Sequence, residues 1–286
     1  MSLRFGYSRS ELSRALPIAA AHGRVSVVNS LILAGADIRD DGGKFALPAA
    51  AANGHVAVVD RLIEVGADVH AFEDYPLRQA ATNGHFEVVD HLISAGACVS
   101  AEGDEPLRRA AENGHPGIVG HLIANGADIH AWDDEALIRA AQKGRLSVVD
   151  RLLKAGANVH GQGDGALRWA SENGHAEVVK QLIRAGAHIH AMDDDALVRA
   201  SENGNAEVVE QLLAAGADAR ARGDGPLRWS AEEGHVEVVQ LLLHCGARKD
   251  TRNDYALRMA TTNGHLRVVD LLMAHNIVLR PNSPTP

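Results

Sequence analysis

The sequence is poor in aromatic residues and in cysteine. Phe, Trp and Tyr make up only 3% of its 286 residues, although apolar residues together make up 46%. A globular core of this size normally uses more large rings, so we expect a core of Ala, Val, Leu and Ile in thin layers. The two cysteines, Cys98 and Cys245, are too few for a disulfide framework.

Basic residues are in the minority, and long apolar runs are lacking. The net charge of −9 and the sequence pI of about 5.9 argue against nucleic acid and anionic membranes as partners. No stretch approaches 18 apolar residues, and the opening MSLRFGYSRSELSRA lacks the apolar core of a signal peptide. We therefore expect a cytoplasmic protein, with the nucleus as the alternative location.

What the sequence does contain is an internal repeat. Glycine recurs with a strict period of 30, at 54, 84, 114, 144, 174, 204, 234 and 264. Gly23 is one residue out of phase because a residue is inserted in the loop RDDGGKF, residues 39–45. Leucine forms a second column at 31, 62, 92, 122, 152, 182, 212, 242 and 272. Nine units therefore cover almost the whole chain.

The first half of each unit has the pattern of a short helix. Leu167, Ala170, Ser171 and Gly174 are spaced i, i+3, i+4 and i+7, which places them on one helical face. Asp164 stands where an N-cap is needed, and Asp recurs there at 74, 104, 134, 194, 224 and 254. Pro76, Pro106 and Pro226 fall in the first turn, where a missing N–H costs little.

The second half of each unit predicts a second helix after an NGH turn. In AEVVKQLIRAG, residues 176–186, Val178 and Leu182 are apolar with helical spacing. Gly186 is expected to end this helix in the left-handed conformation, and Asn276 has that place in the last unit. A link of seven to ten residues, the finger, then leads to the next Asp.

A pair of short helices cannot bury its own apolar face, so neighbouring units must stack. The predicted fold is an all-α solenoid of nine helix-turn-helix units over residues 13–278. Residues 1–12 form an N-terminal segment, and the Pro-rich tail 279–286 is expected to be disordered.

The segments GHFEVVDHLISAGACV and PLRQAATNGH resemble the two halves of the ankyrin repeat, and the resemblance covers roughly residues 8 to 278. Two departures are present. The unit is shorter than the usual length of about 33 residues, and Arg, Ile or Val replaces the His of the usual Thr-Pro-Leu-His start. The short form is similar to arrays encoded by large DNA viruses of amoebae, which would place the protein in a host cytoplasm. The resemblance implies protein–protein recognition through the fingers and the first-helix face, without catalysis.

A period of 60 residues overlies the period of 30. Units that begin Gly-Asp, at 103, 163 and 223, alternate with units that begin Asp-Asp, at 133 and 193. We infer that a block of two units was duplicated.

Catalytic and metal sites are not expected. Ser171, His175 and Asp164 include the residue types of a hydrolase triad, but His175 has copies at 55, 85, 115, 235 and 265. Six copies of one catalytic base make no sense, whereas a turn histidine bonded to the backbone does. A second column, His70, His130, His160 and His190, places the backbones of neighbouring members about 10 Å apart, which disfavours a shared zinc ion. The objection is weaker here than for the turn histidines, because loop side chains can lean together. No cofactor is expected.

The Asp column also allows helical ion pairs. Asp164, Arg168 and Glu172 are spaced i, i+4 and i+8, and exposed pairs of this kind contribute about 0.3–0.5 kcal/mol each. We expect capping and pairing here in preference to an acidic binding stripe.

One column beside the buried face of the first helices is the candidate binding surface. Its members are Gln79, Arg109, Arg139, Trp169, Arg199, Trp229 and Met259. Trp, Arg and Met are enriched at binding hot spots. The alternative is structural: Arg199 stands between Trp169 and Trp229 and would be held by both rings, at about 0.5–1 kcal/mol per contact.

The finger tips vary most between units. They are Phe72, Glu102, Trp132, Gln162, Met192, Arg222 and Arg252. Exposed Phe, Trp and Met on short fingers favour recognition.

The sequence thus predicts a monomeric, non-enzymatic scaffold that binds a protein partner on the concave face formed by first helices and finger tips. An alternative is an adaptor that brings host proteins to a larger complex such as a ubiquitin ligase. An enzyme would need one unit with a unique polar cluster, and every reactive residue type here has copies in other units.

Overall fold

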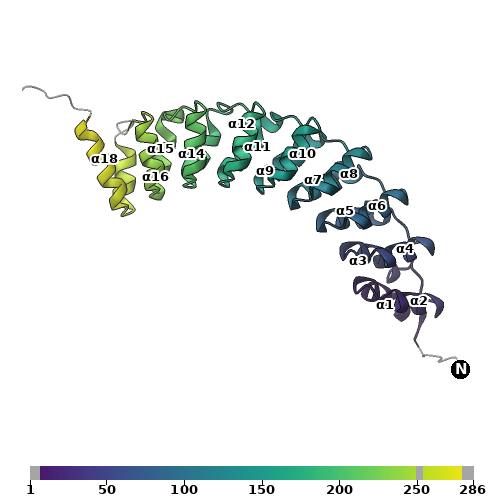
Figure 1. Cartoon of the computed structure of the whole chain (residues 1–286). Helices are drawn as coiled ribbons and strands as arrows, with labels where there is room; N and C mark the ends of the chain where they lie inside the picture. Colours follow the sequence, from purple (N-terminus) through teal and green to yellow (C-terminus); the bar gives the residue numbers. More distant parts are fainter. Residues whose placement is uncertain (1–6, 249–253, 279–286) are drawn as a thin grey trace, which may run out of the picture. The chain divides into compact units, whose positions relative to one another are not determined.

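The computed structural model describes residues 7–248 and 254–278. These residues contain eighteen α-helices, one short 3-10 helix and no strand (Figure 1). The predicted all-α class is therefore confirmed. The predicted tail 279–286 and the finger tip Arg252 lie outside the described residues. Within the described part of the chain, no helix is long and apolar enough to cross a membrane.

The chain divides into two compact units. Unit 1 consists of residues 1–136 and 154–156, and unit 2 of residues 137–153 and 157–286. The boundary therefore falls within helix α9 (Ala131–Gln142). The single solenoid over residues 13–278 stays a prediction.

Unit 1 contains four helical repeats and the beginning of α9. Their elements are α1 (Arg9–Ala21), α2 (Val25–Leu33), η1 (Gly43–Phe45), α3 (Ala46–Ala52), α4 (Val56–Glu64), α5 (Ala71–Asn83), α6 (Phe86–Ser94), α7 (Ala101–Asn113) and α8 (Pro116–Ala124). Helix α1 begins four residues before the predicted start at 13, because Ser8 accepts a hydrogen bond from the backbone N–H of Glu11 and caps it. The first helices α1, α3, α5 and α7 pack side by side.

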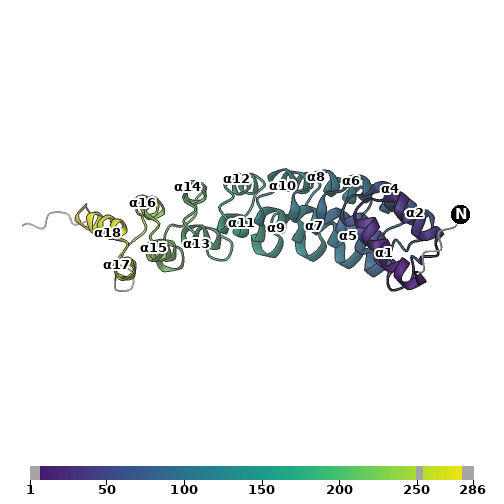
Figure 2. The same cartoon turned by 90° about the horizontal axis from the view of Figure 1, so that it is seen from below.

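Unit 2 continues the same order. Its elements after α9 are α10 (Leu146–Lys154), α11 (Gly161–Glu172), α12 (Ala176–Arg184), α13 (Asp195–Glu202), α14 (Ala206–Ala214), α15 (Ala221–Glu233), α16 (Val236–His244), α17 (Tyr255–Thr262) and α18 (Leu266–Val278). Figure 2 shows α11, α13, α15 and α17 in one row and their partners α12, α14, α16 and α18 in the other.

The core is the predicted thin layer of aliphatic side chains. Leu182 and its column mates from Leu62 onward are fully buried, whereas Leu31 in the first repeat is only half-buried. Leu167 and Ala170 are also fully buried, so the predicted face of the first helix is correct. Small residues there allow the neighbouring first helices to approach closely.

Helix ends follow the glycine columns with one exception. Gly186 has φ +94°, as predicted for the residue that ends a second helix. The prediction for Asn276 is wrong, because α18 continues through it to Val278. Glycine adopts the left-handed conformation without steric cost, whereas Asn carries a Cβ and here stays in the helix.

The fingers contain an element that the sequence did not indicate. In six fingers, three consecutive residues have left-handed backbone angles, within the first turn of α5, α7, α9, α11 and α15 and directly before α13. We call these segments the finger turns; they are residues 72–74, 102–104, 132–134, 162–164, 192–194 and 222–224. Left-handed residues cost roughly 1–2 kcal/mol each when they carry a Cβ, so other contacts must hold the finger turns in place.

The carboxylate of the finger Asp supplies one such contact, and the predicted side-chain N-cap is wrong. Asp194 does stand at the N-cap of α13, but its side chain makes no capping hydrogen bond. Its Oδ1 instead accepts the backbone N–H of Asp218, 24 residues onward, at 3.1 Å. The left-handed backbone turns the carboxylate toward the next finger and away from its own helix. The same bond joins Asp74 to Cys98 and Asp224 to Arg248.

Candidate interaction site on the first helices and fingers

The centre of the candidate surface in unit 2 is Arg199, on α13. Its guanidinium lies over the ring of Trp169 from α11, with 5.1 Å between the central carbon and the ring centroid. Its Nε donates to Oδ2 of Asp195 at 2.6 Å, and its Nη1 pairs with Glu172. Arg199 therefore joins α13 to α11 through the ring of Trp169 and the carboxylate of Glu172.

Asp195 connects three arginines from three successive repeats. Its Oδ2 lies 2.8 Å from Nε of Arg168 and 2.6 Å from Nε of Arg199. Its Oδ1 lies 2.9 Å from Nη2 of Arg222. The Asp195 side chain is only 8% exposed, so these contacts are shielded from water. Hydrogen bonds between charged groups are stronger than neutral ones, and shielding reduces competition from solvent.

Charge stays on this cluster at neutral pH. Burial would raise the pKa of Asp195, but the hydrogen bonds from Arg168 and Arg199 outweigh it and hold the pKa below its ordinary value. Burial would lower the pKa of Arg199, and the hydrogen bonds to Asp195 and Glu172 reverse that shift and raise it. The partly exposed side of the cluster thus presents a fixed cation beside an indole ring.

The predicted ladder of Trp169, Arg199 and Trp229 is only half present. Trp229, on α15, has the guanidinium of Arg228 at 5.7 Å from its ring centroid. Arg199 contacts Trp169 and is held there by Glu172. The two indole rings are both half-buried, as are Arg139 and Met259 in the same column. These side chains are accessible to a partner without being fully exposed.

Unit 1 has a counterpart of this cluster. Glu105 accepts from Nη1 of Arg78 at 2.6 Å and from Nε of Arg109 at 3.0 Å. Arg109 also lies 3.6 Å from Glu112. Burial would raise the pKa of Glu105, but hydrogen bonds from the two arginines outweigh it and lower that pKa. Both units therefore use an acidic residue directly after the finger Asp to bridge consecutive repeats.

The predicted pairing of Asp164, Arg168 and Glu172 along one helix is wrong. Arg168 pairs with Asp195 and donates to the carbonyl of Gln162, and Glu172 pairs with Arg199. Asp164 belongs to a finger turn and faces the next finger, so it is not available to a residue four positions onward. Contacts across repeats replace contacts along the helix.

The apolar finger tips are exposed, and two of them also pack onto the preceding repeat. Trp132 is 66% exposed, Met192 56% and Phe72 42%. Phe72 stacks on Phe45 with 4.9 Å between ring centroids. The guanidinium of Arg108 lies 5.0 Å from the Trp132 ring centroid. Phe72 and Trp132 are thus each held on one side and open to solvent on the other.

These contacts give a physical reason for the 60-residue period. A Cβ on Gly103 would lie 2.4 Å from Nε1 of Trp132, and a Cβ on Gly163 would lie 3.2 Å from Cε of Met192. Glycine in one finger turn makes room for the bulky tip of the next. The Gly-Asp and Asp-Asp units therefore alternate as complementary partners. Their origin by duplication stays a prediction.

The turn histidines are structural, as predicted. Nε2–H of His175 donates to the carbonyl of Gln142 at 3.0 Å. A Cβ on Gly144 would lie 2.7 Å from Nδ1 of the same ring, so the imidazole fills the space above that glycine. The five copies, His55, His85, His115, His235 and His265, also bond a carbonyl of the preceding repeat. The hydrolase triad is not assembled, because His175 is engaged in this way.

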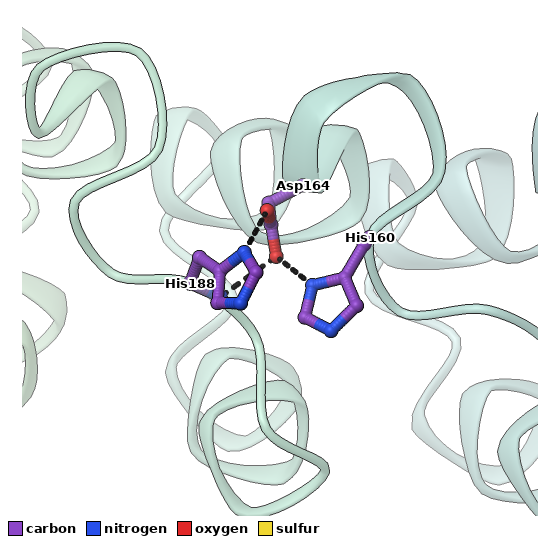
Figure 3. A group of neighbouring side chains, drawn as sticks. All are labelled: His160, Asp164 and His188. Atoms are coloured by element: carbon purple, nitrogen blue, oxygen red, sulfur yellow. Dashed lines mark hydrogen bonds and ion pairs between the residues drawn. The ribbon is translucent and has the colours of Figure 1, made fainter.

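One group of side chains was not predicted. His160 and His188, from consecutive fingers, both direct Nδ1 toward the carboxylate of Asp164 (Figure 3). The distances are 3.0 Å from His160 to Oδ1 and 3.5 Å from His188 to Oδ2. The spacing of about 10 Å disfavours a shared zinc ion for histidines of one column. His160 and His188 belong to different columns, so that spacing does not apply to them.

The sequence pattern did not indicate Asp195, Glu105 and His188 as site residues, for a common reason. Their partners in the preceding repeat lie 24, 27 or 28 residues away, which is less than one repeat. Residues that contact each other across neighbouring fingers are separated by fewer than 30 positions in the sequence. Columns of period 30 therefore do not align them. A signal was present, since Glu105 and Asp195 follow a finger Asp where Gly165 and Gly225 stand in other units.

Comparisons with known proteins agree with this architecture. The family model described as ankyrin repeats (3 copies) matches residues 16–103, 50–133, 107–193 and 197–283. Among solved structures, the chain is similar to the crystal structure of the human ASB11 ankyrin repeat domain, with a TM-score of 0.64 and 28% identity. That match covers 70% of this chain and 96% of the other. A comparison with curated proteins finds no match.

Proposed function

Because the chain belongs to the ankyrin repeat family, whose repeats generally mediate protein–protein interaction, we propose that it is a non-enzymatic scaffold for a protein partner. The partner binds the face formed by the first helices and the finger tips. In unit 2 this surface includes Trp169, Arg199 and Trp229, and in unit 1 it includes Arg109, Phe72 and Trp132.

The observation that carries the proposal is the fixed pair of Trp169 and Arg199. Trp and Arg are the residue types most often found at binding hot spots. Arg199 is already held by Asp195 and Glu172, so a partner would not have to immobilise a flexible guanidinium. Such preorganisation reduces the entropy lost on binding. The pair stays half-exposed, whereas a purely structural pair gains nothing from remaining accessible.

The exposed finger tips support the same surface. Trp132 and Met192 leave more than half of their area in water although glycines in the preceding fingers give them room to pack. Large apolar side chains in water favour burial by a partner.

The test is affinity capture from source cells with the immobilised full chain. Replacing Trp169 and Trp229 together by Ala removes two half-exposed rings and should weaken a captured partner by about 2 kcal/mol or more, roughly thirtyfold in Kd. The affinity is then measured with the purified partner.

The matched control is Phe86→Ala, because Phe86 is an exposed ring on second helix α6, 45% exposed. Its partner affinity should equal that of the wild type. Equal affinities for the double variant and the wild type, with cooperative unfolding retained, would remove this surface from the proposal. An adaptor that recruits proteins to a larger complex is a narrower form of the proposal. It requires that a second protein is captured and that this protein still binds the double variant.

A further inference from the structure

His160, Asp164 and His188 lie close enough to share one ion. Their ligand atoms all lie within 4.8 Å of one another, and no other group of three His, Cys, Asp or Glu residues meets this condition among the described residues. Asp164 comes from a finger turn, His160 from the start of the same finger, and His188 from the next finger (Figure 3). The three side chains converge although 24 residues separate Asp164 from His188.

Two of these residues belong to a pair that recurs. His70 with Asp74 and His190 with Asp194 make the same contact between Nδ1 and Oδ1 as His160 with Asp164. The third residue distinguishes this site. The positions equivalent to His188 in other fingers are Asp68, Cys98, Asp128, Asn158, Asp218 and Arg248. Only this finger adds a second imidazole.

The finger at Cys98 shows that position alone does not make such a site. The backbone N–H of Cys98 donates to Asp74, just as that of His188 donates to Asp164. The Cys98 thiol, however, lies 3.3 Å from the hydroxyl of Ser100. In contrast, the His188 ring stacks on the His160 ring, with 4.0 Å between centroids and 22° between planes. Stacking and the Asp164 contact both hold the His188 ring beside the His160 ring.

The distances suit a tetrahedral ion. Ligand bonds of about 2.0–2.2 Å place neighbouring ligand atoms of a tetrahedral zinc site about 3.3–3.5 Å apart. The two observed contacts between Nδ1 and carboxylate oxygen are 3.0 and 3.5 Å. Two imidazoles and one carboxylate favour a borderline transition metal over Ca²⁺ or Mg²⁺, which prefer ligand sets made of oxygen.

The surroundings also suit a site with three protein ligands. The Asp164 side chain is only 3% exposed, and its Oδ1 accepts the backbone N–H of His188 at 2.7 Å, which fixes the carboxylate. The His188 and His160 side chains are 69% and 40% exposed. Water can therefore reach a fourth coordination position.

We propose that His160, Asp164 and His188 bind one Zn²⁺ ion through two imidazole nitrogens and one carboxylate oxygen, with water as the fourth ligand. A neutral ring that donates Nδ1–H to Asp164 moves this proton to Nε2 when Nδ1 binds the metal. A ring that starts protonated releases one proton to solvent. The ion replaces the hydrogen bond of His160 and the 3.5 Å contact of His188 with Asp164 by a bridge between consecutive fingers.

The test is a titration of the full chain, freed of metal with EDTA, with Zn²⁺ in competition with a chromophoric chelator. The wild type should bind one equivalent in competition with the chelator. His188→Asn introduces the residue that occupies the equivalent position 158, and should weaken binding by at least about tenfold. His70→Asn removes the same type of His–Asp pair in unit 1 and should leave the affinity unchanged.

A gain of binding gives a second measurement. Asp218 occupies the position of His188 beside the pair of His190 and Asp194, and its backbone N–H donates to Asp194. Asp218→His should therefore add a second bound equivalent. Co²⁺ in place of Zn²⁺ should give the visible absorption of a tetrahedral site in the wild type and lose it in His188→Asn.

Circular dichroism checks that the variants remain folded. One equivalent in the wild type that is lost in His188→Asn and retained in His70→Asn supports the site. No competitive binding by the wild type, or equal binding by the wild type and His188→Asn, would overturn it. These outcomes are independent of the captured partner, so the metal site and the scaffold role are tested separately.

Discussion

Asp195 shows how one carboxylate can join several repeats. Arg168, Arg199 and Arg222 come from three successive repeats, and all three meet it. A repeat contacts only its neighbours, so a side chain that reaches both sides is expected to contribute more than an exposed ion pair. The hydrogen bonds and the burial of Asp195 support the same expectation.

Asp195→Asn should lower the free energy of unfolding by about 1.5–3 kcal/mol at neutral pH, the range for hydrogen bonds to charged groups. The measurement is urea denaturation followed by circular dichroism. Asp193→Asn is the matched control, because that side chain is 69% exposed and 3.9 Å from its nearest arginine nitrogen. It should change the free energy by no more than about 0.5 kcal/mol. Equal effects of the two substitutions would contradict the role of Asp195.

The effect of Asp195 should also depend on pH. Its pKa is lower in the folded chain than in the unfolded one, so its carboxylate stabilises the fold fully above the unfolded value, about 3.9. That contribution is lost as the pH falls through the lowered folded pKa. The difference in stability between wild type and Asp195→Asn should therefore be constant from pH 6 to 5 and decrease below about pH 4.

At the level of elements, the finger turns separate what the sequence could and could not predict. Local patterns placed both helices of each repeat, because apolar spacing and glycine act within a few residues. They did not predict three left-handed residues at positions such as Phe72 and Glu73, since these residue types disfavour that backbone. Contacts of the finger Asp with the next finger outweigh the local preference. The finger Asp was therefore placed correctly before the first helix, but its carboxylate bonds the next finger and not the N–H groups of its own helix.

Gly103→Ala and Gly163→Ala form a matched pair for this element. Their φ values are +66° and +64°, so the left-handed backbone penalises Ala similarly at both positions. The new methyl group meets the rigid indole of Trp132 at Gly103 and the flexible end of Met192 at Gly163. Gly103→Ala should therefore destabilise the chain more, by about 1 kcal/mol or more.

Denaturation gives the difference in stability, and the indole N–H resonance of Trp132 reports its displacement. That resonance should shift in Gly103→Ala and stay in place in Gly163→Ala. If both variants lose the same free energy of unfolding and the resonance does not move, the glycines are needed only for the left-handed backbone. The complementary packing of alternating fingers would then be wrong.

At the scale of the whole chain, the period of 30 identified the family but not the contacts between repeats. The leucines that recur every 30 residues are buried alike because each has the same surroundings, as the full burial of Leu92 and Leu182 shows. The contacts of Asp195 and His188 depend on side chains that differ from repeat to repeat, and their offsets fall short of one period. Such contacts arise from the geometry of stacked fingers, which a linear pattern does not describe.

Stability should therefore be lost locally when one repeat is weakened. Leu182 is fully buried, and Leu182→Ala should cost about 2–5 kcal/mol. Leu31→Ala should cost less, because Leu31 is only half-buried. Amide hydrogen exchange measures where the loss occurs. In Leu182→Ala, exchange should accelerate most in α11 to α14 and least in α3 to α6. A uniform acceleration along the chain would instead mean that both compact units open together.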